Sequence, residues 1–358
     1  MRTIPATWYV DPDFLAREQE LVLAPGWSYI GDARAVADPG TFLAASLGHV
    51  PIVVTRDREN ELRALANVCR HRGAVVAEGC GRRATLQCPY HGWTYRLDGS
   101  LHRAAGMEAP EGTRLPQLSV AAVGPLLFAC ADPGAEPLAP QLEPFLERVR
   151  DVAAIEIEAV GWRRRIEHVI DANWKAVVEN FIECYHCPLV HATTLPGFGS
   201  EDYLVELHGR LQTQRLDEAR FAFAFLYPNT LVSAYGDGGA IVARALSPEG
   251  PGRTAVALDY WFEPRVPEAE SDEWIAWFES VIAEDVPLCE SVQRGFASGT
   301  LDTGVLHPVR EAGLAHFHRL LREDLGDRAA DGPAPVEAAG VAYTPPGAVS
   351  SVGRAGDF

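Results

Sequence analysis

The period with which apolar and polar residues alternate changes along the chain. In the first half these changes predict a β module between two helices. Residues 38–130 hold short strand-like runs, such as "HVPIVVTRD" and "GPLLFACAD", separated by Gly, Pro and Asp. A helical period precedes them at 11–24, where it begins at a capping Asp and ends at Pro25-Gly26. Helical periodicity returns at 140–152, where the chain is expected to leave the β module.

The second half mixes strands and helices. Residues 162–170 have a strand-like pattern, and three further runs predict antiparallel strands at 221–236, 240–248 and 254–264. Helical periodicity covers 171–187, 310–326 and a long segment at 271–296, which Pro287 is expected to interrupt. An all-β domain followed by an antiparallel sheet with helices makes the predicted fold class α+β.

These changes of pattern also predict the domain boundaries. An N-terminal helical segment that packs on the second domain takes residues 1–36, and the β domain takes 37–150. The second domain is expected at 151–326. The tail at 327–358 is rich in Ala, Pro and Gly and is expected to be extended.

Composition and charge narrow the possible partners. The formal net charge is −18 over 358 residues, which argues against nucleic acid or an anionic membrane. No apolar run approaches the ~20 residues of a membrane helix, and the N-terminus lacks a signal-peptide core, so we expect a cytoplasmic location. The cysteines are then expected to be reduced thiols or metal ligands and not a disulfide framework; they are Cys69, Cys80, Cys88, Cys130, Cys184, Cys187 and Cys289.

Two short stretches each hold one cysteine and one histidine. Cys69 and His71 are followed, after sixteen residues, by Cys88 and His91 in a Cys-x-x-His arrangement. Such a set can bind zinc, although structural zinc sites usually contain Cys-x-x-Cys pairs. It can also bind a Rieske [2Fe–2S] cluster, in which two Cys hold one iron and two His hold the other. Cys80 lies between the two stretches and is not needed by either arrangement.

The two stretches, "CRHRG" at 69–73 and "CPYHGWTY" at 88–95, resemble a Rieske domain. The resemblance implies that Cys69, His71, Cys88 and His91 are the cluster ligands. His71 and His91 are then the ligands on the solvent side, through which electrons enter and leave.

A second group of candidate ligands lies in the predicted helix at 171–187. Its apolar residues form one stripe, and Glu179, Glu183 and His186 fall on the other side. The simplest interpretation is a solvated polar face. However, Pro188 breaks the helix and allows His191 to approach His186. Two histidines and one carboxylate are the ligand set of non-haem Fe(II) oxygenases.

The pattern Glu-x-x-His-x-x-x-x-His, within "NWK", "ENF" and "ECYHC", resembles the catalytic domain of Rieske non-haem iron oxygenases. The resemblance implies iron ligands at His186, His191 and Asp285, with Glu284 as the competitor for the third position. It also implies that Glu183 bridges His186 and a Rieske histidine, His91, of a neighbouring subunit. Asn180 is a candidate for the substrate side of the iron, with a solvated amide as the alternative.

The same resemblance implies the fold, the cofactors and the partners. The second domain is expected to have a helix-grip (START-like) fold. The cofactors are a [2Fe–2S] Rieske cluster and a mononuclear Fe(II). The chain lacks a Gly-rich nucleotide fingerprint, so NAD(P)H electrons must come through a separate reductase, with or without a ferredoxin. Electron transfer between subunits implies a homotrimer, and the substrates are O2 and a small organic molecule.

The segments "EDVPLCESVQRG" and "HPVREAGLAHFHRLL" resemble the branch with choline, glycine betaine and carnitine oxygenases. This branch implies monooxygenation, with oxidative N-demethylation of a quaternary ammonium compound as one form. An aromatic-ring-hydroxylating dioxygenase is the alternative, and a Rieske electron carrier without a second iron is the alternative of another class. Six aromatic residues of the predicted strands are candidates for a cage around a quaternary ammonium group, and the alternative is that they are ordinary core residues of the sheet. They are Phe221, Phe223, Phe225, Tyr227, Tyr235 and Trp261.

Overall fold

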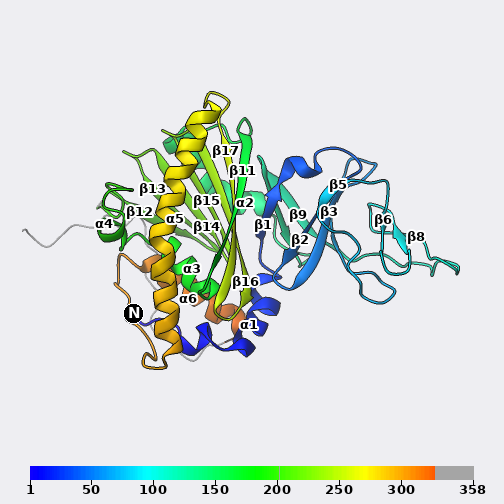
Figure 1. Ribbon diagram of the computed structural model, residues 1–358, viewed down its shortest axis with the longest axis horizontal. Coiled ribbons are helices and arrows are strands. Elements are labelled where there is room, and N and C mark those ends of the chain that lie inside the picture. The colour runs from blue at the N-terminus through cyan, green and yellow to red at the C-terminus, as the bar shows by residue number, and fades with distance from the viewer. Residues whose placement is uncertain (201, 327–358) are drawn as a thin grey trace, which may run out of the picture.

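The computed structural model describes residues 1–200 and 202–326. Its first domain is built on one antiparallel seven-stranded sheet. Its order is β1-β10-β9-β4-β3-β2-β5. A smaller sheet, β6-β7-β8, carries the tip of the domain (Figure 1). The all-β module predicted at 38–130 is confirmed. The strands are β1 (Ser28–Asp32), β2 (Thr41–Leu47), β3 (Val50–Arg56), β4 (Leu62–Ala66), β5 (Cys80–Arg82), β6 (Leu86–Gln87), β7 (Thr94–Tyr95), β8 (Leu101–Arg103), β9 (Gln117–Val123) and β10 (Leu126–Cys130).

The sheet begins before the expected domain boundary at residue 37. β1 pairs with β10 through Ser28 and Ala129, so the segment we assigned to an N-terminal helical extension contributes the edge strand. The preceding part is helical as expected, with η1 (Ala6–Tyr9), α1 (Pro12–Glu18) and η2 (Gln19–Leu23). The Asp11 side chain caps α1 by accepting a hydrogen bond from the backbone N–H of Asp13. A short 3-10 turn, η3 (Ala33–Val36), leads into the sheet.

The second domain holds a second antiparallel seven-stranded sheet, in the order β11-β17-β16-β15-β14-β13-β12. The predicted strands are confirmed, but β12 and β13 were missed. Because β13 contains three buried polar residues, Gln212, Thr213 and Gln214, its sequence does not show the apolar pattern of a core strand. The strands are β11 (Gly161–Ile170), β12 (Leu204–His208), β13 (Leu211–Leu216), β14 (Phe221–Leu226), β15 (Thr230–Tyr235), β16 (Ala240–Gly250) and β17 (Arg253–Phe262).

The two faces of this sheet differ in the size of their side chains. On β14 the large residues Phe221 and Phe223 face one core, and Ala222 and Ala224 face the other. The large side chains pack against α3 (Trp174–Phe181), α5 (Glu268–Ala297) and α6 (Ala312–Leu325), which cover that face (Figure 1). The small side chains allow α2 (Leu138–Arg148) and its extension η4 (Val149–Ala153) to pack on the opposite face. The helix expected at 140–152 therefore lies between the two domains.

Helix α5 continues through Pro287, contrary to the expected interruption. A proline inside a helix removes one hydrogen bond, and it frees the carbonyl four residues earlier. Here both Pro287 and Ala283 are exposed, so water can bond the freed carbonyl. No helix among the described residues has the length and apolarity needed to cross a membrane. The tail expected at 327–358 lies outside the described residues.

A fully buried ion pair connects the N-terminal segment to α3. The Lys175 ammonium lies 2.7 Å from a carboxylate oxygen of Glu18, and both side chains are completely buried. The indole Nε1–H of Trp174 donates to the other Glu18 oxygen at 2.8 Å. Burial lowers the pKa of Lys175, although the Glu18 carboxylate opposes this shift. The pair fixes the N-terminal end of α3, which is the end opposite to the one that leads into the following turn.

Replacement of Lys175 by Met is therefore expected to destabilise the second domain. It leaves the Glu18 carboxylate buried without a cation, which typically costs about 3–5 kcal/mol. For a domain of this size that corresponds to a fall in Tm of roughly 10 °C, measured by tryptophan fluorescence. The double variant Glu18→Gln, Lys175→Met should recover part of the loss. Arg253→Met, which removes two exposed ion pairs, is the control. An equal Tm in Lys175→Met and Arg253→Met would contradict the expectation.

Candidate iron site and cluster loops

The segment that follows α3 turns because two side chains from the sheet bind its last carbonyl. Helix α3 ends at Phe181, whereas the periodicity predicted a helix to residue 187. The side-chain amides of Gln212 and Gln214 on β13 each donate to the Ile182 carbonyl at 2.6 Å. These bonds take the place of the next helical hydrogen bond. The chain then turns through 182–186 and enters α4 (Cys187–Val190), with His186 at its N-cap.

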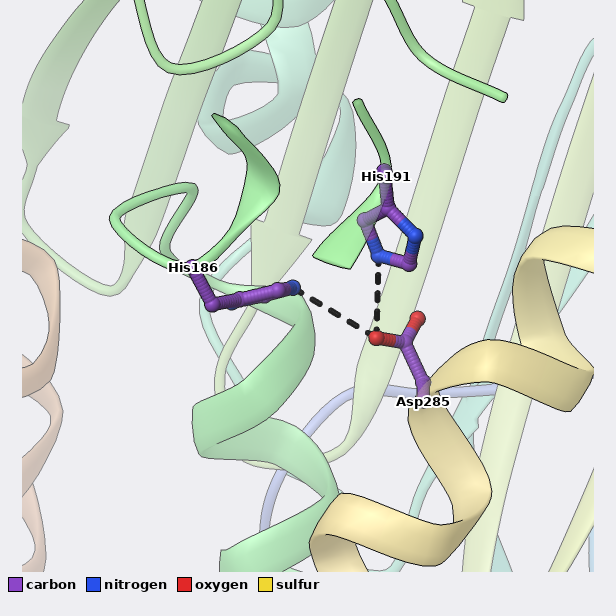
Figure 2. A group of neighbouring side chains, drawn as sticks. All are labelled: His186, His191 and Asp285. Carbon is purple, nitrogen blue, oxygen red and sulfur yellow. Dashed lines mark hydrogen bonds and ion pairs between the residues drawn. The ribbon is translucent and has the colours of Figure 1, made fainter. Parts of the chain in front are cut away.

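The turn brings two histidines and one aspartate together (Figure 2). His186 and His191, which bracket α4, approach Asp285 on α5. The Asp285 Oδ1 atom lies 3.0 Å from His191 Nε2 and 3.4 Å from His186 Nε2. One ligand atom from each residue lies within 4.8 Å of the others, and among the described residues no other set of His, Cys, Asp and Glu meets this criterion. Two imidazole nitrogens and one carboxylate oxygen form a facial ligand set that suits a non-haem iron.

Each histidine contacts Asp285 through Nε2 and a further carboxylate through Nδ1. The Nδ1 of His186 bonds to Glu183 at 2.5 Å, and the Nδ1 of His191 bonds to Glu284 at 2.6 Å. The Thr194 hydroxyl donates to the same Glu284 oxygen at 2.7 Å. Carboxylates in this position orient metal-binding histidines and leave Nε2 directed at the ion. Glu284, the competitor for the third ligand position, thus points to His191 while Asp285 faces the shared site.

The electrostatics of the site follow from these contacts. Burial by itself lowers the pKa of His186, but its bonds to Asp285 and Glu183 outweigh burial and raise the pKa to about 10. His191 shows the same balance, with a raised pKa caused by Asp285 and Glu284. Burial raises the pKa of Asp285, yet the two histidines lower it overall. The carboxylate is therefore held as an anion, which favours a bound cation.

Asn180, on the last turn of α3, also contacts the site. Its amide Nδ2 donates to Asp285 Oδ1 at 3.4 Å, so it is not an exposed, solvated amide. Glu179 lies elsewhere, since its carboxylate accepts from Tyr9 at 2.5 Å and His318 at 2.8 Å. The helix predicted at 171–187 included Tyr185, but this residue is exposed because the helix has already ended.

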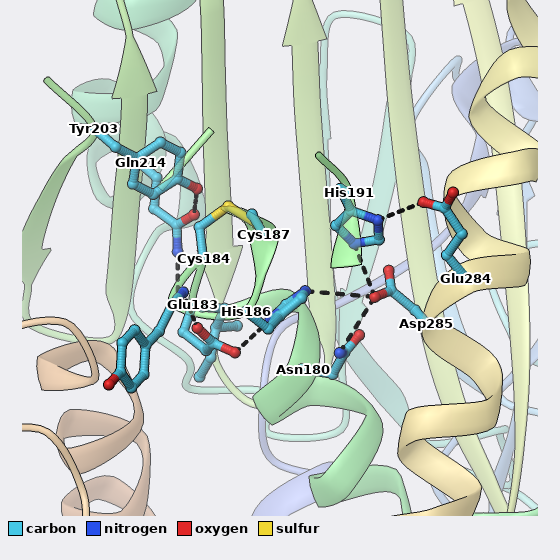
Figure 3. Close-up of a disulfide and its surroundings, with 12 residues drawn as sticks. Asn180, Glu183, Cys184, His186, Cys187, His191, Tyr203, Gln214, Glu284 and Asp285 are labelled. Atoms are coloured by element: carbon cyan, nitrogen blue, oxygen red, sulfur yellow. Dashed lines mark hydrogen bonds and ion pairs between the residues drawn. A yellow bond between two sulfur atoms is a disulfide. The ribbon is translucent and has the colours of Figure 1, made fainter. Parts of the chain in front are cut away.

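Two cysteines beside the ligands form a disulfide, contrary to the expectation of reduced thiols (Figure 3). Cys184 and Cys187 lie on either side of His186 in sequence, and the turn brings their Cα atoms to 5.0 Å, a separation that a disulfide can span. The other five cysteines are free. The bond crosses the turn at 182–186, which carries Glu183 and His186.

A cavity opens next to the three converging residues. His186, His191, Asp285, Asn180 and Glu183 all contribute to its lining. Of the six aromatic residues considered for an ammonium cage, Phe221, Phe223 and Tyr235 line it. The other three do not. Phe225 and Tyr227 contact Phe317 of α6, and Trp261 packs on the opposite face of the sheet.

Four further aromatic residues line the cavity without having been predicted. Two of them lie in the poorly patterned stretch between α4 and β12, and the others lie on α3 and α5. Phe181 belongs to the apolar stripe of the predicted helix, and this was the only sequence signal for any of the four residues. The four are Phe181, Phe198, Tyr203 and Phe278.

The four candidate cluster ligands lie at the tip of the first domain, beside the small sheet. Cys69 and Cys88 are buried, and burial raises the pKa of the Cys88 thiol, with Cys69 next to it adding to the shift. The rings of His71 and His91 meet edge to face with centroids 4.7 Å apart, and both residues are exposed. The thiols therefore form an inner pair and the imidazoles an outer pair.

This pairing suits a two-iron cluster better than a zinc ion. Bond lengths near 2.0–2.3 Å would bring all four ligand atoms of a zinc site to within roughly 4 Å of one another. In the described part of the chain, no three of these four residues have ligand atoms within 4.8 Å of one another. A Rieske cluster instead separates the cysteine pair from the histidine pair.

Comparison with known proteins identifies the family. Residues 26–119 match the family described as the Rieske [2Fe-2S] domain. Residues 146–222 and 214–327 match the catalytic domain of the ring hydroxylating alpha subunit. The chain belongs to the ring-hydroxylating alpha subunits with a Rieske domain. It is therefore a Rieske non-haem iron oxygenase, an oxidoreductase whose cofactors are a [2Fe–2S] cluster and a mononuclear iron.

Similar proteins cover almost the whole alpha subunit. Chloroplastic choline monooxygenase of Beta vulgaris is 32% identical over 352 residues, covering 90% of this chain and 77% of that protein. The carnitine monooxygenase oxygenase subunit of Escherichia coli (strain K12) is 29% identical over 357 residues, with 91% and 94% covered. The crystal structure of apo CntA, a quaternary ammonium Rieske monooxygenase, is 27% identical with a TM-score of 0.78, covering 90% and 95%. The predicted α+β fold class is confirmed.

The hydroxyl of Tyr95 contacts the sulfur of a candidate cluster ligand. It accepts a hydrogen bond from the backbone N–H of Arg70 at 2.9 Å, and its oxygen lies 3.3 Å from Cys69 Sγ. Its own proton is therefore available to the sulfur. Hydrogen bonds to cluster sulfurs stabilise the added negative charge of the reduced state.

Tyr95→Phe is expected to lower the reduction potential of the alpha subunit's cluster. A hydrogen bond to a charged group contributes about 1.5–3 kcal/mol, and a tenfold change in a one-electron equilibrium is about 59 mV, so a fall of roughly 60–130 mV is expected. Protein-film voltammetry measures it. Tyr90→Phe, at an exposed position in the turn that precedes β7, should leave the potential unchanged. A potential in Tyr95→Phe equal to that of the wild type would disprove the role of this hydroxyl.

Glu284→Gln is expected to weaken iron binding without removing a proposed ligand. Loss of a carboxylate behind a metal-binding histidine typically reduces metal affinity by about 10–100-fold. Competition with a chromophoric chelator measures the affinity of the mononuclear site, with the cluster quantified separately by its visible absorbance. Glu273→Gln, on the exposed side of the same helix, is the matched control. If both variants bind iron like the wild type, Glu284 does not position His191.

Proposed function

We propose that this alpha subunit hydroxylates a small organic substrate, using dioxygen and electrons supplied by a separate NAD(P)H reductase. The observation that carries the proposal is the convergence of His186, His191 and Asp285 beside a cavity. These three residues are the proposed iron ligands, and Glu284 is assigned the outer position. The proposed cluster ligands are Cys69, His71, Cys88 and His91.

The residues around the iron ligands have separable roles in this proposal. When bound, the iron and the cluster supply dioxygen chemistry and electron transfer. Glu183 and Glu284 hold the two imidazoles by their Nδ1 atoms, so that each Nε2 faces the site. Asn180 restrains the Asp285 carboxylate and reaches the cavity. The aromatic lining excludes water from the reacting groups, which strengthens every polar contact made there.

We further propose that the alpha subunits form a homotrimer in which each site is completed by a neighbour. In one chain the tip of the first domain and the segment around α4 lie at opposite ends of the molecule (Figure 1). Exposed apolar residues accompany both ends, with Tyr90 and Met107 on the tip and Tyr185 and Leu189 near α4. A cyclic head-to-tail arrangement covers both. Glu183 would then lie between His186 and His91 of the partner subunit.

The proposed partners and location follow from the same assignment. A reductase, with or without a ferredoxin, is expected to dock where His71 and His91 approach the surface. We place the protein in the cytoplasm in this proposal. The plant choline monooxygenases that it resembles are chloroplastic, and this proposal does not assign their location to the present chain.

For the reaction, we propose monooxygenation of a methyl or methylene group, with N-demethylation as one form of it. The support is the similarity to proteins named for choline and carnitine. Dihydroxylation of an aromatic ring is the second candidate. It is favoured by a cavity wall that contains Phe181, Phe221, Phe223 and Phe278.

The decisive test is an EPR measurement on iron- and sulfide-reconstituted protein, reduced without oxygen and treated with nitric oxide. The proposal expects two signals, one from a reduced Rieske cluster and one from a high-spin iron–nitrosyl. In His191→Ala only the cluster signal should remain, and turnover with a reductase should be lost. His208→Ala, on β12 and outside the site, is the control. A wild type that shows only the cluster signal at full iron loading would support an electron carrier instead.

A further inference from the structure

One cationic side chain lies in the cavity wall beside the proposed iron site. Arg244 of β16 lines the cavity and is only 4% exposed. Its guanidinium carbon lies 5.0 Å from the ring centre of Phe278 and 5.5 Å from that of Phe181. Residues of β16 alternate between the two sheet faces, and Arg244 shares the helix-covered face with Val242 and Leu246. Its side chain therefore belongs to the same layer as the proposed iron ligands.

No carboxylate of the described chain forms an ion pair with Arg244. Asp285 contributes favourably to its charge from a distance, but its Oδ1 atom is engaged by His186 and His191 and forms no ion pair with Arg244. Glu279 is engaged by Tyr260, at 2.5 Å, and by His168, at 2.8 Å. The Nε atom of Arg244 is buried without a hydrogen-bond partner.

A second unpartnered donor lies next to Arg244 on the same sheet face. Arg244 pairs with Leu231 of β15, and Ser233 lies two residues further along that strand, on the same side. The Ser233 hydroxyl is also buried without a hydrogen-bond partner. Ser233 and Arg244 both line the cavity, as does Tyr235. The Arg244 Nε and the Ser233 hydroxyl thus lie in one wall rich in Phe and Tyr, where, among the described residues, the only group within reach of both side chains that these contacts show is the neutral Tyr235 hydroxyl.

Such an arrangement is unfavourable unless an anion completes it. A buried cation without an anionic partner loses its hydration, and flanking aromatic rings or a neutral hydroxyl compensate for only part of that loss. The desolvation shows in the pKa of Arg244, which burial lowers even though Tyr235, Tyr260 and Asp285 oppose the shift. A guanidinium presents parallel N–H donors that match the two oxygens of a carboxylate.

We propose that the substrate carries a carboxylate, which binds to Arg244 and Ser233 on the sheet side of the cavity. The inference rests on the proposed function, and it narrows the substrate class of that same site. A cationic alcohol such as choline lacks the anionic group and would place its charge near that of Arg244. The acid is either a betaine, with a quaternary ammonium group, or an aromatic acid whose ring meets the phenylalanine side chains.

The test uses two matched pairs of probes, each an acid and its alcohol: glycine betaine with choline, and benzoate with benzyl alcohol. Isothermal titration calorimetry on the iron-loaded, cluster-containing protein, without reductase, measures each Kd. At least one acid should bind more tightly than its alcohol by about 10-fold or more, since a hydrogen bond to a charged group contributes about 1.5–3 kcal/mol. The pair that shows the preference identifies the betaine or the aromatic class.

The variants assign the preference to the cavity wall. Arg244→Met should weaken binding of the preferred acid by about 10-fold or more, with little change for its alcohol, and Arg244→Lys should restore part of the loss. Arg253→Met, an exposed position on the neighbouring strand, should preserve the preference. If Arg244→Met does not fold, Ser233→Ala removes the other donor and should still reduce the preference. Equal binding of acid and alcohol by the wild type, no binding of either acid, or a full preference in Arg244→Met would overturn the proposal.

The same samples separate this inference from the proposed function. The nitrosyl signal reports whether the mononuclear iron is present, independently of any probe. A missing signal refutes the oxygenase assignment for the site. A normal signal with no preference for either acid refutes only the carboxylate.

Discussion

The site depends on the two glutamine amides that bind the carbonyl of Ile182. If α3 continued, that carbonyl would accept from the backbone N–H of residue 186, and His186 would remain on a regular helix. Because Gln212 and Gln214 supply the donors instead, the chain turns and carries His186 and His191 toward Asp285. The buried polar residues of β13 therefore do not weaken the sheet. They couple it to the segment with the proposed ligands, and the buried Glu18–Lys175 pair fixes the beginning of the same helix.

The charges around this turn are arranged in layers. Asp285 forms the inner layer with two imidazoles, and Glu183 and Glu284 form an outer layer behind them. Three carboxylates around two imidazoles give a region that favours a divalent cation. Arg244 lines the same cavity with the opposite charge. The cavity therefore has one group of side chains suited to a metal and another suited to an anion, which would fix the orientation of an asymmetric substrate.

Local motifs were predictable from the sequence, and long-range contacts were not. Cys69, His71, Cys88 and His91 are recognisable because their spacing is short, and so are Glu183, His186 and His191. The end of α3 was missed because it depends on β13, about 30 residues further along the chain. Glu284 and Asp285 are adjacent, and only the packing of α5 decides which of them faces the site. Arg244 had no signal, since "AIVARALSP" has the pattern of an ordinary strand whose arginine reaches solvent.

The positions of the two sites within one chain also explain why their surroundings differ. The cluster loops present His91 to solvent, where a redox partner can approach closely. The mononuclear site is enclosed by aromatic side chains and by the sheet, because a reactive site must exclude water while a ligand is held. One location cannot be both open to a protein partner and sealed around a small molecule. Placing the sites at opposite ends satisfies both demands, provided that the neighbouring subunit closes the distance between them.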